Sequence, residues 1–153
     1  MSEYSFKEAA ERAAANVEAP KPFPAGLWRF RINGGKAKEI TGAGDKAPVW
    51  KALYPCTPIE PIENVSDDEL QVYGDYTEAT VYHEIPVFRK DDEWKIKRFH
   101  AEILGQTDMD GVSITGLPET GRGHEFVGEV FHDYVEGRED PLTKIKNVVA
   151  VEV

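Results

Sequence analysis

The sequence predicts a β-rich α+β domain, a five-stranded barrel with one helix between its third and fourth strands and an extra helix at the N-terminus. Several short segments alternate between apolar and polar residues with a period of two, which is typical of strands with one buried face. Turn-forming glycines and prolines separate these segments. One later segment instead spaces its apolar residues by three and four, as a helix does. The chain has 153 residues, 41% of them hydrophobic, which is enough for a single core.

The N-terminal region, residues 1–22, is predicted to be a helical arm followed by a proline-rich connector. Within residues 3–17, Ser5 is a suitable N-cap, and Glu8 completes a capping box ahead of an alanine-rich run with high helix propensity. A run of alternating prolines then favours extended chain. We therefore treat residues 23–153 as the barrel domain.

The first strand is predicted at Leu27–Ile32. Its tryptophan, phenylalanine and isoleucine alternate with Arg29 and Arg31, so the apolar side chains are expected to face the core and both arginines to face outward. Asn33-Gly34-Gly35 ends this strand with a turn, and a second turn is expected at Gly42–Asp45.

Four further strands are predicted at Val49–Tyr54, Ala79–Phe88, Phe126–Val135 and Lys144–Val153. Pro55 is expected to stop the second of the five strands, and Thr57–Gly74, rich in prolines and acids, is predicted to be a long loop. A helix with its body at Trp94–Leu104 follows the third strand and ends at Gly105. Three strands, a helix and two strands is the order of the oligonucleotide-binding (OB) barrel.

Charge is unevenly distributed along the chain. The net charge is −10, which by itself disfavours a polyanionic partner. Basic residues nevertheless dominate Arg29–Lys51, and a second basic cluster lies at Arg89–Arg98. Between them, Ala52–Phe88 contains no lysine or arginine. A folded chain could gather the two basic clusters on one side, although solvated surface charge is the simpler interpretation of either cluster alone.

The sequence resembles a family of small phage-encoded proteins with single-stranded-DNA-binding-like barrels. The segments that carry the resemblance are Phe23–Ile32, Lys36–Lys38 with Gly42 and Gly44, Phe99–Gly105, Phe126–Val130 and Ile145–Val148. The resemblance implies non-catalytic coating of unpaired DNA in phage replication or recombination, in the host cytoplasm. Replication or recombination proteins are then expected partners, and a homo-oligomer remains open. Many such proteins end in an acidic tail, whereas Val149–Val153 reads as a strand, which puts recruitment through a tail in doubt.

Single-strand binding needs cations for phosphates and aromatic faces for bases. The candidate phosphate contacts are Arg29, Arg31, Lys36, Lys38 and Lys51. The candidate stacking residues are Trp50, Tyr54 and Tyr82, with Tyr73 and Tyr76 as further possibilities. Which face of the second strand points inward stays open, because both of its faces carry apolar residues.

Other chemistries have little support in the sequence. The four histidines lack metal-ligand spacing, the single cysteine has no nearby histidine in sequence, and no phosphate-binding glycine motif is complete, so we expect no metal, no cofactor and no enzymatic activity. No signal peptide or membrane span is visible, which predicts a cytoplasmic protein without a membrane partner. The alternative function is an acidic protein–protein interaction module, a phage accessory or host-docking factor that does not bind nucleic acid.

Overall fold

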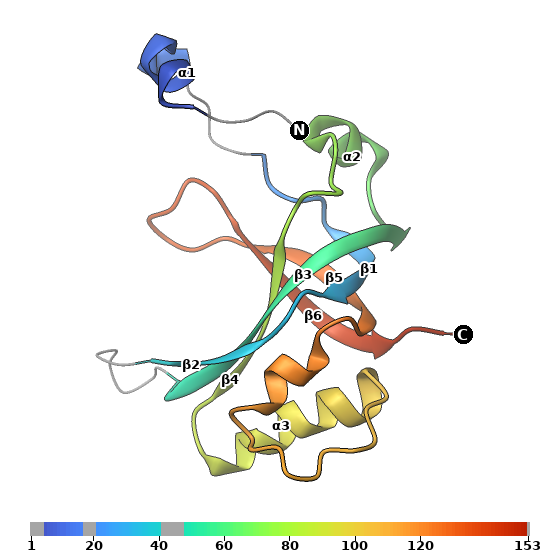
Figure 1. Cartoon of the computed structure of the whole chain (residues 1–153). Coiled ribbons are helices and arrows are strands. Elements are labelled where there is room, and N and C mark those ends of the chain that lie inside the picture. The colour runs from blue at the N-terminus through green and yellow to red at the C-terminus, as the bar shows by residue number, and fades with distance from the viewer. Residues whose placement is uncertain (1–4, 17–20, 41–47, 153) are drawn as a thin grey trace.

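The computed structural model describes residues 5–16, 21–40 and 48–152 and has an open antiparallel sheet of six strands with a few short helices (Figure 1). The strands are β1 (Gly26–Ile32), β2 (Lys36–Glu39), β3 (Trp50–Glu63), β4 (Val81–Val87), β5 (Glu125–Asp133) and β6 (Leu142–Ala150). The α-helices are α1 (Phe6–Glu11), α2 (Asp67–Tyr73) and α3 (Glu93–Arg98). The shorter helical turns are η1 (Ala14–Asn16), η2 (Lys90–Asp92), the π-helical η3 (Phe99–Ile103) and η4 (Leu117–Gly121).

The sheet is organised around β3, which is 14 residues long. β1 pairs with its second half, ending with Ile32 opposite Cys56. β2 continues along the same edge, beginning with Lys36 opposite Leu53. β4 occupies the other edge of the first half of β3. Beyond β1 come β5 and then β6. β2, β4 and β6 each pair with one neighbouring strand, so they are the outer strands of an open sheet.

The core lies on the inner face of this sheet, as the alternation in the first strand predicts. Trp28, Phe30 and Ile32 are all buried, and the indole Nε1 of Trp28 donates a hydrogen bond to the Pro24 carbonyl at 3.0 Å. Phe30 packs against Phe126 of β5 with 5.6 Å between ring centroids. The predicted first strand is therefore confirmed, including its buried face.

β4 and the helical segment after it also confirm the predicted periodicities. In β4 every second residue is buried, starting with Val81. In α3 and η3, Ile96, Phe99 and His100 are buried on one stripe, as the helical spacing predicts. Gly105 follows this segment with φ +72°, a conformation that favours glycine.

The segment after Pro55 differs from the prediction, because β3 runs through three prolines to Glu63. Pro55 lies where the neighbouring edge is interrupted between β1 and β2. Cys56 is the last residue of β3 that pairs with β4. Pro58 and Pro61 follow it, where β3 pairs only with β1 and the register shifts. Proline has no backbone N–H to donate, so it is tolerated where a strand has no neighbour to accept that bond or where the register is irregular.

Other elements were misplaced or missed by sequence reasoning. The helix predicted over residues 3–17 is shorter among the described residues, with α1 ending at Glu11. Its predicted cap is present, since the Glu8 N–H donates to Ser5 Oγ at 3.2 Å. β2 and α2 were not predicted, and the expected turn at Gly42–Asp45 lies outside the described residues. Within the part of the chain described, none of the helices has the length and apolar character needed to cross a membrane.

Candidate nucleic-acid interface

The outer face of β3 and β4 carries the side chains that these strands turn away from the core. In β4, Tyr82, Glu84 and Pro86 alternate with the buried residues and face outward. The register places Pro55 opposite Tyr82. With both flanking positions of the strand buried, the Tyr82 ring projects outward and is 49% exposed.

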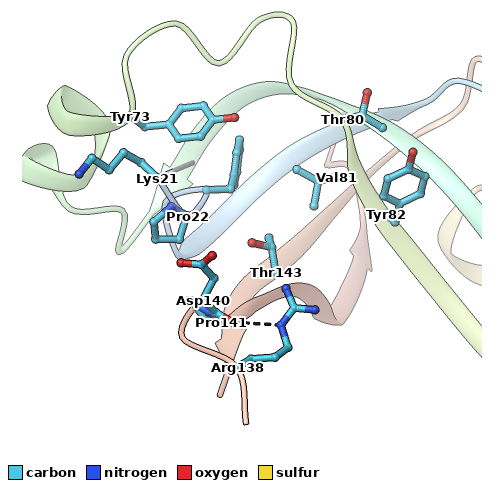
Figure 2. Close-up of a pocket in the computed structure, with 11 residues that line it drawn as sticks. Lys21, Pro22, Tyr73, Thr80, Val81, Tyr82, Arg138, Asp140, Pro141 and Thr143 are labelled. Atoms are coloured by element: carbon cyan, nitrogen blue, oxygen red, sulfur yellow. Dashed lines mark hydrogen bonds between the residues drawn. The ribbon is translucent and has the colours of Figure 1, made fainter. Parts of the chain in front are cut away.

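Three hollows meet at Tyr82, and together they form what we call the Tyr82 groove. The first, of about 430 Å³, lies between the start of β4, Tyr73 at the end of α2, and Arg138 and Asp140 of the segment between β5 and β6. Figure 2 shows Tyr73 and Lys21 on one side of this hollow, Arg138 and Asp140 below it, and Tyr82 at its far end.

The other two hollows extend from Tyr82 in different directions. One of about 590 Å³ lies between β4 and β6 and is lined by Phe131 and Ile145 among others. One of about 440 Å³ lies at the break between β1 and β2, beside Gly34 and Gly35. Because all three include Tyr82, an extended ligand could cross the outer face of the sheet in contact with this ring.

The lining of the Tyr82 groove is basic, although the chain carries a net charge of −10. Its acidic residues are Glu84, Glu119 and Asp140. Its basic residues are Lys21, Lys36, Lys51, Arg122, Arg138, Lys144 and Lys146. The fold therefore concentrates positive charge on one surface of an acidic protein.

Four of these cations already have carboxylate partners. Lys51 lies 2.6 Å from Glu84, Arg122 lies 2.7 Å from Glu119, Lys144 lies 2.6 Å from Asp133, and Lys146 lies 3.7 Å from Glu129. Such exposed pairs contribute only about 0–1 kcal/mol each, so a phosphate could replace a carboxylate at little cost. Among the described residues, Lys21, Lys36 and Arg138 form no salt bridge.

Four of the five predicted phosphate contacts lie on the same outer surface as the Tyr82 groove or beside it. Lys36 and Lys51 line the Tyr82 groove, and Lys38 lies directly opposite Lys51 in the register, on the same face. Arg31 is exposed on the outer side of β1, opposite Thr57. These four residues extend the basic surface from β1 across β2 and β3.

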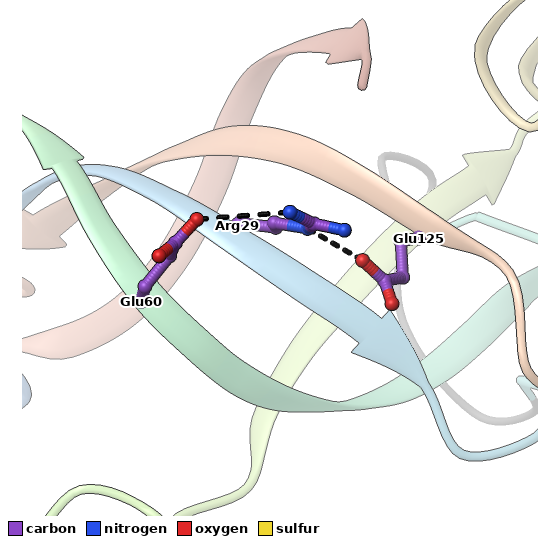
Figure 3. Close-up of polar contacts among 3 residues, drawn as sticks. All are labelled: Arg29, Glu60 and Glu125. Atoms are coloured by element: carbon purple, nitrogen blue, oxygen red, sulfur yellow. Dashed lines mark hydrogen bonds and ion pairs between the residues drawn. The ribbon is translucent and has the colours of Figure 1, made fainter. Parts of the chain in front are cut away.

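Arg29, the fifth predicted phosphate contact, is paired with two carboxylates. Its Nε lies 2.5 Å from a carboxylate oxygen of Glu125 on β5, and a terminal guanidinium nitrogen lies 3.7 Å from Glu60 on β3 (Figure 3). One positive charge is thus held between two negative ones, which disfavours a phosphate at this point. Arg29 instead connects the outer faces of three adjacent strands.

Tyr54 is a correction to the predicted interface, since its side chain is fully buried. The Tyr54 hydroxyl lies 2.8 Å from Nε2 of His100, so the ring cannot offer a face to a base. Trp50 shares the inner face of β3 with Tyr54 and is half-buried at the margin of the core. The open question about β3 is therefore answered: Ala52 and Tyr54 point inward.

The hydroxyl of Tyr54 begins a chain of hydrogen bonds that runs from the core to partly buried residues. His100 Nδ1 lies 2.9 Å from the amide oxygen of Gln106, which assigns Nδ1 as the donor and leaves Nε2 to accept from Tyr54. The Gln106 amide then donates to Thr120 at 3.0 Å, and Thr120 donates to the Leu117 carbonyl at 2.6 Å. Burial raises the pKa of Tyr54 and lowers that of His100, so this chain is uncharged near neutral pH.

Several residues of the Tyr82 groove were missed by sequence reasoning. Lys144 and Lys146 alternate with Ile145 on a strand that was predicted, so their common outward face could have been recognised. Their closeness to Tyr82 depends on the long-range placement of β6 beside β4, which no local pattern encodes. Lys21 and Arg138 lie in irregular segments that the fold brings to the same hollow.

Across the described residues, no group of three or more His, Cys, Asp or Glu side chains is placed to hold a metal ion. Comparison with known proteins found no family model that matches the chain and no curated protein sequence that matches it.

Proposed function

We propose that this protein binds single-stranded nucleic acid, with DNA as the expected form, along the Tyr82 groove. One observation carries the proposal: an exposed aromatic ring lies where three hollows meet whose charged lining residues are mostly basic, on a chain with a net charge of −10. In the setting of a phage, such a protein would coat unpaired DNA during replication or recombination without catalysing a reaction.

We further propose that the sheet is a partly open OB barrel. β1 and β2 follow one edge of β3 like a single bent strand, and α3 lies between β4 and β5 in the chain. Counting β1 and β2 as one strand gives five strands in the OB order, with β4 and β6 flanking a shared hollow. OB folds bind oligonucleotides on their second and third strands and at the loop between the last two. The lining of the Tyr82 groove by β3, β4 and the segment around Arg138 supports this assignment.

The chemistry of the groove suits an unpaired strand. A base stacked on the Tyr82 ring would contribute about 1–3 kcal/mol, whatever its identity, because every base has a flat aromatic face. Phe131 offers a second ring in the same hollow, with Lys146 Nζ 4.7 Å from its centroid. Lys36 and Arg138 would contact phosphates on either side of Tyr82 and release counterions. Duplex DNA keeps its bases stacked on one another and would lose the aromatic contribution.

The test is the anisotropy of a fluorescein-labelled oligo-dT titrated with native protein at low salt. Tyr82→Ala should weaken binding about 5- to 150-fold, the factor that corresponds to the stacking of one base. Tyr134→Ala is the matched control, because Tyr134 is 76% exposed and lines none of the three hollows. Equal affinities of the two variants would refute the role of Tyr82, and no binding by the native chain would refute the function.

Acidic docking on another protein is the second candidate, and α2 is the observation that favours it. Its first turn carries Asp67, Asp68 and Glu69, and Val72 on the same helix is 63% exposed. A pull-down from lysate with and without nuclease separates the two functions. A specific partner that persists after nuclease and is lost with Val72→Asp would favour docking, whereas a partner lost after nuclease would favour nucleic acid.

A further inference from the structure

A second pocket lies away from the Tyr82 groove, where α3 and η3 pass over the outer strands β4 and β6. Its volume is about 330 Å³, and its lining shares no residue with the three hollows that meet at Tyr82. Apolar walls are formed by Ile85 of β4, Phe99 and Ile103 of η3, and Val148 of β6. These residues come from elements on both sides of the open edge of the sheet, so the pocket depends on the gap between β4 and β6.

The side chain of His83 also lines this pocket and is the most unusual group in it. It is only 6% exposed, and neither ring nitrogen has a hydrogen-bond partner among the described residues. Its ring packs against those of Phe99, at 4.9 Å, and Phe126, at 5.6 Å, which also contact each other. Buried polar atoms are nearly always paired, so the imidazole is available to a partner from outside the chain.

His100 provides the comparison within the same protein. It is also buried, yet both of its ring nitrogens are bonded, to Tyr54 and to Gln106. The two histidines also lie within one cluster of rings around Tyr54. The fold therefore satisfies one buried imidazole completely and leaves the other facing a pocket.

The rim of the pocket is basic. Lys95 and Arg98 project from α3, each with a side chain that is 64% exposed. Lys95 lies 3.1 Å from Asp92, and Arg98 lies 2.9 Å from Glu102, but neither carboxylate lines the pocket. Asp92 is buried and is also held by the backbone N–H groups of Phe88 and Arg89, whereas both cations are largely exposed. Lys95 and Arg98 can therefore turn toward an anion at the rim.

We propose that this pocket binds a small apolar acid that carries a second polar group away from its carboxylate, such as a hydroxylated aromatic carboxylic acid. Its anionic group lies at Lys95 and Arg98, its apolar body lies between Phe99 and Val148, and a polar atom of its inner part bonds to His83. Positive charge at the rim selects against neutral lipids and amines. The modest volume selects against long acyl chains and against an unstacked nucleotide chain.

The experiment uses anilinonaphthalene sulfonate as the probe, since it combines an anionic group, apolar rings and an N–H donor. Titration of the folded full-length chain at neutral pH should give saturable fluorescence that 4-hydroxybenzoate reverses. Arg98→Glu should weaken probe binding about fivefold or more, while Lys97→Glu is the matched control. Lys97 is an exposed cation of the same helix that does not line the pocket.

The NMR chemical shifts of the His83 ring nitrogens provide a second measurement, which reports on contact with the buried imidazole and not on surface charge. They should change on adding the probe, whereas those of His100 should change little. Equal losses with Arg98→Glu and Lys97→Glu would overturn the proposal, as would unchanged His83 shifts or fluorescence that never saturates. Oligo-dT binding should be unaffected by the probe, so this proposal and the nucleic-acid proposal fail independently.

Discussion

His83→Phe should make the protein more resistant to mild acid. His83 lies on the inner face of β4, and its two ring nitrogens are the unpaired buried side-chain atoms found among the described residues. Burial lowers the pKa of His83 from 6.5 to about 4, because the charged imidazolium would lose its hydration among the surrounding rings. Phenylalanine has a similar shape, cannot titrate and removes the unpaired atoms.

The size of the effect follows from that pKa. Between pH 6.5 and about 4 the unfolded chain binds a proton at His83 that the folded chain does not bind, so the free energy of unfolding falls as the pH falls. The full loss is roughly 3 kcal/mol, at about 1.4 kcal/mol per pH unit, and roughly 2 kcal/mol of it is reached by pH 5. At neutral pH, removing an unpaired buried polar group should raise the stability or leave it unchanged.

The assay is urea unfolding followed by tryptophan fluorescence at pH 7 and pH 5, above the range in which most carboxylates titrate. The wild type should lose about 2 kcal/mol more than His83→Phe between these two values. Equal acid sensitivity of His83→Phe and the wild type would refute the reasoning.

Three further predictions concern the hydrogen-bond chain, the Arg29 pairs and the turn after β1. Tyr54→Phe should lower the free energy of unfolding by about 1–3 kcal/mol in urea, because it leaves Nε2 of His100 buried without its donor. Arg29→Ala should cost no more than about 1 kcal/mol and should not weaken oligo-dT binding, whereas a large loss of affinity would restore Arg29 as a phosphate contact. Gly35→Ala should cost about 1–3 kcal/mol in thermal unfolding, because its Cβ would lie 2.3 Å from the Pro118 carbonyl oxygen, and an unchanged melting temperature would contradict this.

The elements that could be predicted from the sequence are those with one apolar and one polar face. β1 and β4 alternate cleanly, and the stripe on α3 and η3 has helical spacing, so local pattern and tertiary burial agree. β3 does not alternate in this way. With apolar residues on both of its faces, the pattern could not decide whether Tyr54 or Leu53 points inward.

Two missed elements have different explanations. The start of α2 could have been predicted, because Ser66 and Glu69 have capping-box spacing. In the structure the Glu69 N–H donates to Ser66 Oγ at 3.3 Å. β2 could not have been predicted, because Lys36–Glu39 has a single small apolar residue and is a strand only by pairing with β3. Lys36 and Lys38 of β2 nevertheless lie within Arg29–Lys51, the stretch that the sequence shows to be rich in basic residues.

The candidate interface could be predicted only in part, for a reason of topology. Lys36, Lys51 and Tyr82 lie on strands that pair directly with one another. The residues predicted from the sequence therefore include three that line the Tyr82 groove. The remaining cations of the Tyr82 groove come from β6 and from irregular segments, and only the long-range packing of the chain brings them together. For Arg29, the sequence does not reveal the carboxylates that pair with it. Glu60 and Glu125 are distant in sequence and reach Arg29 only in the folded sheet.

The central claim is tested most directly by titrating labelled oligo-dT with the native protein over a series of salt concentrations. The three groove cations without salt bridges among the described residues, Lys21, Lys36 and Arg138, should each neutralise one phosphate. At about −0.7 per phosphate, the logarithm of the binding constant should fall with the logarithm of salt with a slope of about −2 or steeper. No binding at low salt, or an affinity that does not change with salt, would contradict the account.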